Sequence, residues 1–385
     1  MLTIGNPSSK EASLYFHIPF CTRKCEYCHF YVLPDQEPLK NQLLEGFKLE
    51  WERMLPFLQD KSIATIYFGG GTPSLFGPDR IRSILEMIHH SLPFDFSQTE
   101  ITLEVNPENA QPALMQAYAQ AGINRASLGI QTLDPDLLTL LGRLHSPSLA
   151  IKAVQDTYQA GISNISVDLM YDLPKQSLHH WEMTLEYIRS LPLSHLSLYN
   201  LTIEPHTIFF KKQAELTPLL PNEEASLAMY NSAIERLTNF GLEQYEISAF
   251  AKPGFYSRHN TGYWTARPFL GFGPSAFSYW QGKRFRNIAH LGKYYRALKS
   301  GHSPIDFEEQ LDAEAHLKEL FVIQIRLCQG ILQSEFERRH GALSQETLQT
   351  LEYLLQEGFF SHSKGCWKLT KKGILFYDTV ATELI

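Results

Sequence analysis

Short apolar runs alternate with amphipathic segments over about the first 200 residues of this 385-residue chain, and this repeat restricts the fold to few classes. The runs are rich in Ile, Val, Leu, Tyr or Phe and end at Gly, Pro or Asn, as strands do. The predicted strands are residues 14–18, 63–68, 100–105, 125–130, 165–170 and 195–201. Apolar residues recur at helical spacing in residues 42–58, 80–92, 148–160 and 178–191. The repeat predicts an α/β fold in which helices cover the outside of a parallel sheet.

Six strand–helix units indicate a partial (β/α)6 barrel over residues 1–215, since a complete barrel of this type has eight. A doubly wound open sheet is the alternative. In both architectures, ligands bind at the carboxyl ends of the strands.

The second half of the chain has a different pattern. Residues 216–300 contain one amphipathic helix, 223–239. The stretch 244–280 is rich in Gly, Pro and aromatic residues, so we expect a loop-rich segment that covers the barrel. Residues 301–385 show helical patterns at 313–326, 333–340 and 344–357, a hairpin at 358–370 and a last helix at 372–382. This order predicts a C-terminal winged-helix-like α+β domain.

Three of the five cysteines, Cys21, Cys25 and Cys28, fall within eight residues after the first predicted strand. Zinc is one candidate for such a cluster, but zinc sites usually present two pairs of ligands. Three thiolates on a short loop also suit three corners of a [4Fe–4S] cluster, whose fourth iron is then open to a small molecule. The spacing CxxxCxxC favours the cluster. Cys328 and Cys366 are isolated, and we expect them to be small core residues.

Polar residues follow the other predicted strands at their carboxyl ends. The second strand ends in Gly69-Gly-Gly-Thr-Pro73, a turn that allows close backbone approach. Glu104, Gln131 and Asp168 lie at the ends of the third, fourth and fifth strands, and Arg143 follows the fourth. Each alone is often a capped turn or a buried hydrogen bond. Together with the cysteine loop they converge on one rim, where we predict a site.

CxxxCxxC after a first β/α strand resembles the radical S-adenosylmethionine (SAM) superfamily, in which the open iron binds the amino and carboxylate groups of SAM. More narrowly, the chain resembles the oxygen-independent coproporphyrinogen III oxidase family from about residue 13 to the C-terminus. The motifs that carry this resemblance are Tyr15-Phe-His-Ile-Pro-Phe-Cys21, Gly69-Gly-Gly-Thr-Pro-Ser74, Asn124-Arg-Ala-Ser-Leu-Gly-Ile-Gln131, Leu141-Gly-Arg143 and Val167-Asp-Leu-Met-Tyr-Asp-Leu-Pro174.

The resemblance implies a [4Fe–4S] cluster on Cys21, Cys25 and Cys28. It also implies SAM contacts at Tyr15, Gly70, Gly71, Thr72, Glu104, Gln131, Arg143 and Asp168. From charge alone, Glu104 suits the ammonium group of SAM and Arg143 the carboxylate. Asp168 or Gln131 suits the ribose.

Two branches of that family remain open. The decarboxylating oxidases use a 5′-deoxyadenosyl radical. They carry a fourth cysteine two residues after the third, and a longer N-terminal extension. In this chain Phe30 takes the position of the fourth cysteine, and only some fourteen residues precede the first strand. The heme-chaperone branch carries an HNxxYW motif, which matches His259-Asn-Thr-Gly-Tyr-Trp264. This resemblance implies heme contacts at His259, Asn260, Tyr263 and Trp264. Asp172 and His29 stand where Gly and Asp are usual.

Charge and hydropathy limit the partners. The net charge of −7 disfavours nucleic-acid binding, which the winged-helix-like tail otherwise suggests. Residues 1–10 lack a basic-then-apolar signal, and no apolar stretch has the length of a membrane helix. We therefore expect a cytoplasmic protein whose partners are heme or porphyrin, an electron donor and heme-acceptor proteins.

Overall fold

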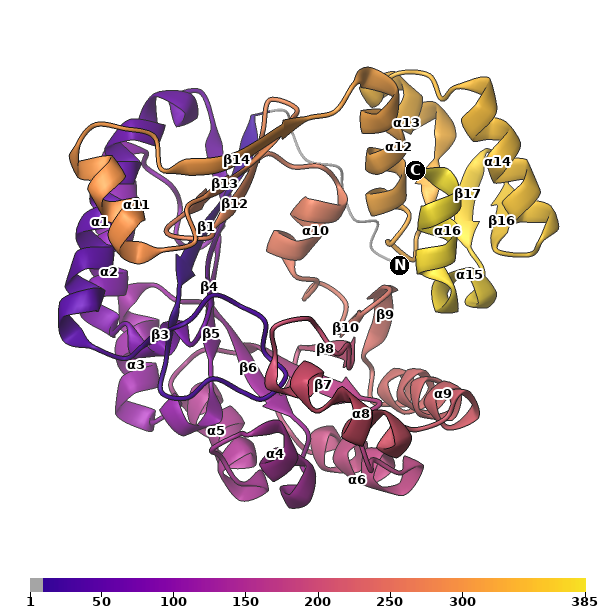
Figure 1. Ribbon diagram of the computed structural model, residues 1–385, viewed down its shortest axis with the longest axis horizontal. Helices are drawn as coiled ribbons and strands as arrows, with labels where there is room; N and C mark the ends of the chain where they lie inside the picture. The colour runs from indigo at the N-terminus through magenta and orange to yellow at the C-terminus, as the bar shows by residue number, and fades with distance from the viewer. Residues whose placement is uncertain (1–9) are drawn as a thin grey trace.

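The computed structural model describes residues 10–385 (Figure 1), so the absence of a signal in residues 1–9 lies outside the described residues. A curved sheet, with helices along its outer side, forms the larger part of the molecule. A smaller helical unit made by the C-terminal residues lies beyond the open side of this sheet.

The parallel centre of the sheet has the six predicted strands in chain order. They are β1 (Glu11–Ile18), β4 (Ser62–Gly70), β5 (Glu100–Val105), β6 (Arg125–Gln131), β7 (Asn164–Tyr171) and β8 (His195–Asn200). Each pairs in parallel with the next, so their carboxyl ends form one rim. The α/β prediction and the partial six-unit barrel are confirmed.

The sheet continues beyond this centre at both edges, to twelve strands within residues 10–385. On one side lie β11 (Phe269–Phe272), β12 (Phe277–Trp280), β13 (Lys283–Asn287) and β14 (Ile305–Gln310); on the other lie β10 (Ala249–Ala251) and β9 (Glu243–Glu246). The expectation of a loop-rich segment at 244–280 is therefore wrong. Four strands of three or four residues lie there, too short to show periodicity, and their partners are far away in sequence. The boundary at residue 301 is also early, because β14 belongs to the main sheet.

The outer side of the sheet is covered by helices, most of them between consecutive parallel strands (Figure 1). These are α1 (Glu37–Leu58), α2 (Pro78–Ser91), α3 (Pro112–Ala121), α4 (Pro135–Leu141), α5 (Pro147–Gln159), α6 (Leu178–Arg189), α9 (Glu223–Asn239) and α11 (Leu291–Lys299), with the short α7 (Ile208–Lys211) and α8 (Gln213–Leu216) after β8. Many begin at a side chain that accepts a hydrogen bond from the first turn, such as Asp134, Ser146 and Asn222.

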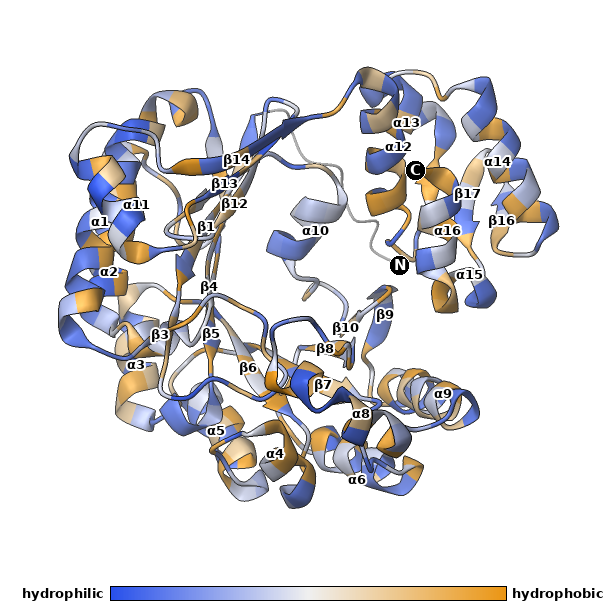
Figure 2. Ribbon diagram, in the orientation of Figure 1, coloured by the Kyte–Doolittle hydropathy of each residue, from blue (hydrophilic) through white to orange (hydrophobic). Residues whose placement is uncertain are grey.

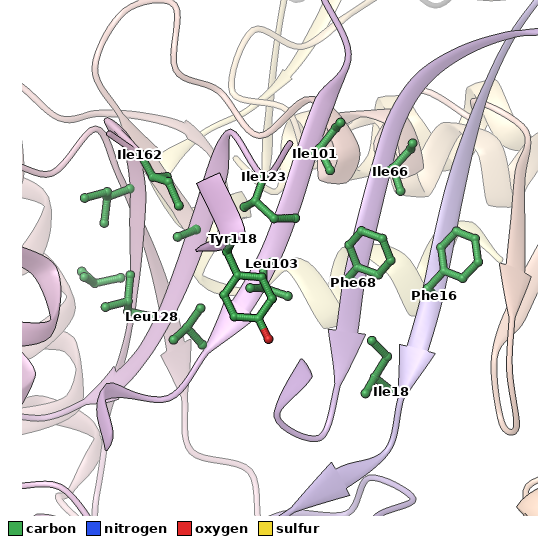
Figure 3. Packing of buried hydrophobic residues seen from close by; sticks show 14 of the residues in the cluster. Phe16, Ile18, Ile66, Phe68, Ile101, Leu103, Tyr118, Ile123, Leu128 and Ile162 are labelled. Atoms are coloured by element: carbon green, nitrogen blue, oxygen red, sulfur yellow. The ribbon is translucent and has the colours of Figure 1, made fainter. Parts of the chain in front are cut away.

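Side-chain alternation along the strands separates an apolar core from a polar interior. Along β1, Leu14, Phe16 and Ile18 are fully buried on the helix side. Phe16 stacks on Phe272 and Phe68 with ring centroids 4.8 and 5.3 Å apart, and Figure 3 shows part of this packing. The intervening side chains point to the inner side, where most are polar. The strand period of two thus supplies both the core and the wall of a site.

Strand β13 is rich in basic residues and the edge strand β14 in acidic residues, and both appear mostly blue in Figure 2. Arg286 pairs with Asp306 at 3.0 Å, and Lys283 pairs with Glu308 at 2.8 Å. Charged side chains on an edge strand oppose pairing with another chain.

The C-terminal unit consists of three helices, a hairpin and two terminal helices. Its elements are α12 (Ala313–Gln324), β15 (Ile331–Leu332), α13 (Gln333–His340), α14 (Gln345–Gln356), β16 (Phe360–Ser363), β17 (Cys366–Leu369), α15 (Lys371–Leu375) and α16 (Tyr377–Leu384). They enclose a separate hydrophobic core around Phe321, Phe360 and Trp367. The helix α10 (Arg258–Trp264) lies between this unit and the inner side of the sheet (Figure 1).

Candidate active site and adjacent aromatic cavity

The cysteine loop leaves the barrel rim directly after β1, between the short strands β2 (Phe20–Cys21) and β3 (Leu33–Pro34). Cys21, Cys25 and Cys28 are free thiols that line one cavity of about 420 Å³, which we call the cysteine cavity. Burial raises the pKa of Cys21 to about 11 and also raises the pKa of Cys28. Three thiols on one loop facing an open cavity are a donor set that fits a cluster with one iron left for a ligand.

The glycine turn after β4 packs directly on the cysteine loop. A Cβ at Gly71 would lie 2.7 Å from the carbonyl oxygen of Phe20 and 3.0 Å from Sγ of Cys21. The backbone N–H of Thr72 donates to the same carbonyl at 2.7 Å. Gly70 has a φ of +119°, with the His17 ring against its Cα. Gly71 is therefore needed for contact with the cysteine loop, and Gly70 for contact with His17 of β1.

Glu104 lies on the wall of the cysteine cavity and is held in place by two donors. The Tyr67 hydroxyl donates to Oε1 at 2.8 Å, and the backbone N–H of Gly70 donates to Oε2 at 3.0 Å. Burial raises the pKa of Glu104 to about 7 despite these bonds. A nearby ammonium group would favour the ionised carboxylate.

Arg143 connects the cysteine loop to β6 and to the residue that follows β5. Its Nη1 lies 3.5 Å from Sγ of Cys25, and its Nη2 donates to Oδ1 of Asn106 at 2.9 Å and to the carbonyl of Gly129. Its buried Nε has no hydrogen-bond partner among residues 10–385. An unsatisfied guanidinium nitrogen beside the cavity fits a carboxylate ligand.

The predicted Asp168 and Gln131 line the same cavity. Asp168 accepts hydrogen bonds from the Ser127 hydroxyl at 3.2 and 3.3 Å, and burial raises its pKa to about 6. Gln131 ends β6 at a bulge with a φ of +68°. The structure therefore brings Gly70, Gly71, Thr72, Glu104, Gln131, Arg143 and Asp168 together around the cysteines.

Tyr15 is the predicted contact that the structure places elsewhere. It lies in the middle of β1, and its hydroxyl bonds Nδ1 of His17 at 2.9 Å, so it lines the neighbouring cavity. Its contact with SAM stays a prediction. Conversely, sequence reasoning missed Asn106 and Tyr199, which also line the cysteine cavity. Both lie at the carboxyl end of a predicted strand, and that position was the signal for them.

A second cavity of about 540 Å³, the aromatic cavity, adjoins the cysteine loop. His29 and Phe30 line both cavities. Its other walls come from β1, α10, the β11–β13 strands and α12 of the C-terminal unit: Tyr15, His17, Tyr31, Tyr263, Trp264, Ala266, Arg267, Phe269, Ser275, Phe277, Ser278, Tyr279, Arg284, Glu319, Leu320 and Ile323. A mostly apolar cavity of this size is typical of small-molecule sites, which occupy ~300–1,000 Å³.

The predicted heme residues of the HNxxYW motif divide between different surroundings. Tyr263 and Trp264 line the aromatic cavity, whereas Asn260 faces a small polar cavity inside the barrel. His259 is 1% exposed. Its Nδ1 bonds the Thr65 hydroxyl and its Nε2 bonds the Tyr263 hydroxyl, both at 2.8 Å. Thus neither ring nitrogen of His259 is open to a metal in this structure.

Asp172 and His29, which stand where Gly and Asp are usual in the family, have different surroundings. Asp172 has a φ of +62°, which explains why Gly is usual there, and its Oδ2 accepts from Asn200 at 2.8 Å and from Ser226 at 2.5 Å. His29 is exposed, and its ring lies against Phe30 with centroids 4.7 Å apart.

Comparison with known proteins agrees with this geometry. The model of the radical SAM superfamily matches residues 15–188, and the model of the HemN C-terminal domain matches residues 311–376. The structure of coproporphyrinogen III oxidase (HemN) from Escherichia coli superposes with a TM-score of 0.85, at 21% identity, over 97% of this chain and 90% of that chain. This likeness concerns the fold.

Curated relatives match over almost the whole length. The heme chaperone HemW of Bacillus subtilis is 30% identical over 96% of this chain and 97% of its own. The heme chaperone HemW of Escherichia coli is 32% identical over 96% of both chains. A zebrafish protein, radical S-adenosyl methionine domain-containing protein 1, is 38% identical over 69% of this chain and 60% of its own.

The cysteine loop on a six-strand partial barrel thus defines a radical SAM protein, a class that holds a [4Fe–4S] cluster and SAM. Within that class, the chain belongs to the HemW heme chaperone family. Across residues 10–385, no helix combines the length and apolar character needed to span a membrane.

Proposed function

We propose that this protein is a cytoplasmic heme chaperone that binds heme and transfers it to acceptor proteins. The observation that carries the proposal is the aromatic cavity, which shares His29 and Phe30 with the cysteine cavity. Aromatic walls suit the faces of a porphyrin, and the large apolar cavity suits its bulk. The names of the relatives point the same way.

The cysteine cavity is the proposed place of the [4Fe–4S] cluster, on Cys21, Cys25 and Cys28. When held by these three thiolates, such a cluster would supply one electron to SAM, and an electron-donor protein would then be needed to reduce the cluster again. Glu104 is proposed to take the SAM ammonium group and Arg143 the carboxylate, because the first is an acceptor and the second has an unused Nε.

The remaining proposed SAM contacts position the ligand. Gly70, Gly71 and Thr72 offer backbone close to the cysteine loop. Asp168 and Gln131 are placed to accept from or donate to hydroxyl groups of the ribose. They line the same cavity as the glycine turn.

Two residues of the HNxxYW motif are proposed to contact heme, and the other two are proposed to support them. Tyr263 and Trp264 contact heme directly, since both line the aromatic cavity. His259 positions Tyr263 through the 2.8 Å hydrogen bond, and Asn260 supports α10 from the barrel side. This assignment makes His259 a positioning residue.

Oxidation of coproporphyrinogen III is disfavoured by Phe30, which is half exposed and lines both cavities. The decarboxylating enzymes carry cysteine at this position.

Two assays on anaerobically reconstituted protein test the proposal. Heme is titrated and followed by its absorption band, and separately coproporphyrinogen III and SAM are supplied with a reductant. We expect saturable heme binding and no protoporphyrinogen; product formation or the absence of a heme band would overturn the proposal.

A further inference from the structure

Arg267 is a mostly buried cation on the wall of the aromatic cavity, and within residues 10–385 its one ion pair, with Glu11, is long. Its side chain is 8% exposed, and its Nη1 donates to the Ser13 hydroxyl at 3.2 Å and to the Arg258 carbonyl at 3.0 Å. Glu11 is 3.8 Å from Nε, which makes no hydrogen bond within residues 10–385. A buried guanidinium is stabilised by a carboxylate with good hydrogen-bond geometry. This cavity wall is therefore suited to a ligand that carries a carboxylate.

The same cavity presents one accessible imidazole among its described residues. Two histidines line it, His17 and His29. The His17 ring is 5% exposed, bonds Tyr15 through Nδ1 and packs against Gly70, so the protein itself covers it. His29 is exposed and lies on the cysteine loop, and within residues 10–385 neither of its ring nitrogens makes a hydrogen bond. An accessible imidazole is a common protein ligand of heme iron.

Most of the remaining wall is aromatic or aliphatic, and the charged Arg284 and Glu319 there pair with each other. Tyr31, Trp264, Phe277 and Tyr279 contribute rings to a cavity of about 540 Å³. Rings favour contact with the face of a conjugated macrocycle. A flat macrocycle with a central metal and a peripheral carboxylate satisfies the rings, His29 and Arg267 together.

We propose that the aromatic cavity is the tetrapyrrole site, with His29 as the axial ligand of the heme iron and Arg267 as the partner of a propionate. This proposal rests on the proposed function, and it assigns the site and its two polar contacts. Because His29 directly follows Cys28, it places the heme beside the predicted cluster.

The contact between His29 and the heme iron is tested by comparing heme with the same macrocycle without iron. Wild type, His29→Ala and the control His302→Ala, an exposed histidine outside both cavities, are titrated with heme and with metal-free protoporphyrin IX. Iron content confirms that each variant carries its cluster. We expect His29→Ala to shift the heme absorption band and to weaken heme binding by about tenfold or more, with protoporphyrin binding unchanged. A band identical to that of wild type overturns the assignment of His29.

The carboxylate contact is tested by changing the ligand as well as the protein. Heme and its dimethyl ester, in which both carboxylates are neutral, are compared in wild type and Arg267→Gln. We expect the ester to bind wild type about tenfold more weakly than heme, and the two ligands to bind Arg267→Gln equally. If wild type and Arg267→Gln prefer heme over the ester to the same extent, the assignment of Arg267 is overturned, even if the variant is less stable.

The location of the heme site is tested with a larger side chain that fills part of the aromatic cavity. Ile323→Trp on α12 narrows the cavity, and Leu332→Trp, at a half-exposed residue outside it, is the control. We expect heme binding to fall in the first variant and not in the second; equal heme binding in the two variants overturns the site. If wild type binds no heme at all, the proposed function fails, whereas heme binding unaffected by these changes defeats the further inference alone.

Discussion

The guanidinium of Arg326 lies over the ring of Trp264, with Cζ 4.4 Å from the ring centroid. Arg326 follows α12 of the C-terminal unit, and Trp264 is the last residue of the HNxxYW motif. The same guanidinium lies 5.0 Å from the Tyr377 ring and 3.5 Å from Oε2 of Glu246. One side chain thus connects the C-terminal unit, a wall of the aromatic cavity and the edge of the sheet.

Replacing Arg326 by Ala is expected to loosen the C-terminal unit. The change removes both ring contacts and leaves the buried Glu246 without its cation, which costs about 3 kcal/mol of unfolding free energy. Hydrogen exchange should rise in α12 and α16 more than in the parallel strands. The double variant Arg326→Ala, Glu246→Gln should recover part of the stability, because no buried charge is then left unpaired. Uniform exchange across the whole chain would argue against a local connection.

His259→Ala is expected to lower the amount of heme bound without moving its absorption band. The substitution removes hydrogen bonds to Thr65 and Tyr263 inside the barrel, so α10 loses its support. Burial and hydrogen-bond loss predict about 2 kcal/mol of destabilisation, which chemical unfolding will measure. A shifted band in this variant, together with an unshifted band in His29→Ala, would make His259 the ligand.

Gly71→Ala is expected to reduce cluster assembly. Its Cβ would collide with the Phe20 carbonyl at 2.7 Å and displace the loop that carries Cys21. Iron and sulfide content after anaerobic reconstitution should fall by more than half. Gly292→Ala, where the nearest atom is 3.4 Å away on a side chain, is the matched control and should keep full iron content.

Glu50 is expected to make stability depend on pH. Burial raises its pKa to about 7, although Gly273, Asn287 and Tyr294 all donate to it. Because the folded state holds the proton more tightly than the unfolded state, this contribution is present below about pH 4.5 and is lost as pH rises through 7. The loss amounts to up to about 3 kcal/mol. Urea unfolding of wild type and Glu50→Gln between pH 5 and 8 isolates it, since the difference between the two proteins should change with pH. A constant difference would contradict the raised pKa.

The parallel strands and the polar rim could be predicted because both follow short-range rules. Alternation along β1 and β5, and the position of a residue directly after a strand, were enough to bring Glu104, Asp168 and the cysteines to one cavity. Asn106 met the same rule and was overlooked.

The aromatic cavity could not be predicted by such rules. Its walls come from β1, α10, β12 and α12, whose lining residues Tyr15 and Ile323 are 308 positions apart, so the cavity needs the C-terminal unit to be packed in place. The burial of His259 was invisible for the same reason, since its partner Thr65 is 194 positions away. Four strands of three or four residues in the 244–280 region were missed because pairing, and not periodicity, makes them strands.

The two adjacent cavities are proposed to hold SAM with its cluster and heme at the same time. The most direct measurement is electron paramagnetic resonance of the reconstituted, reduced protein, with and without one equivalent of heme, before and after SAM is added. We predict that SAM changes the cluster signal to the same extent in both samples and leaves the heme absorption band in place. Displacement of heme by SAM, or a cluster signal that no longer responds to SAM once heme is bound, would contradict the account.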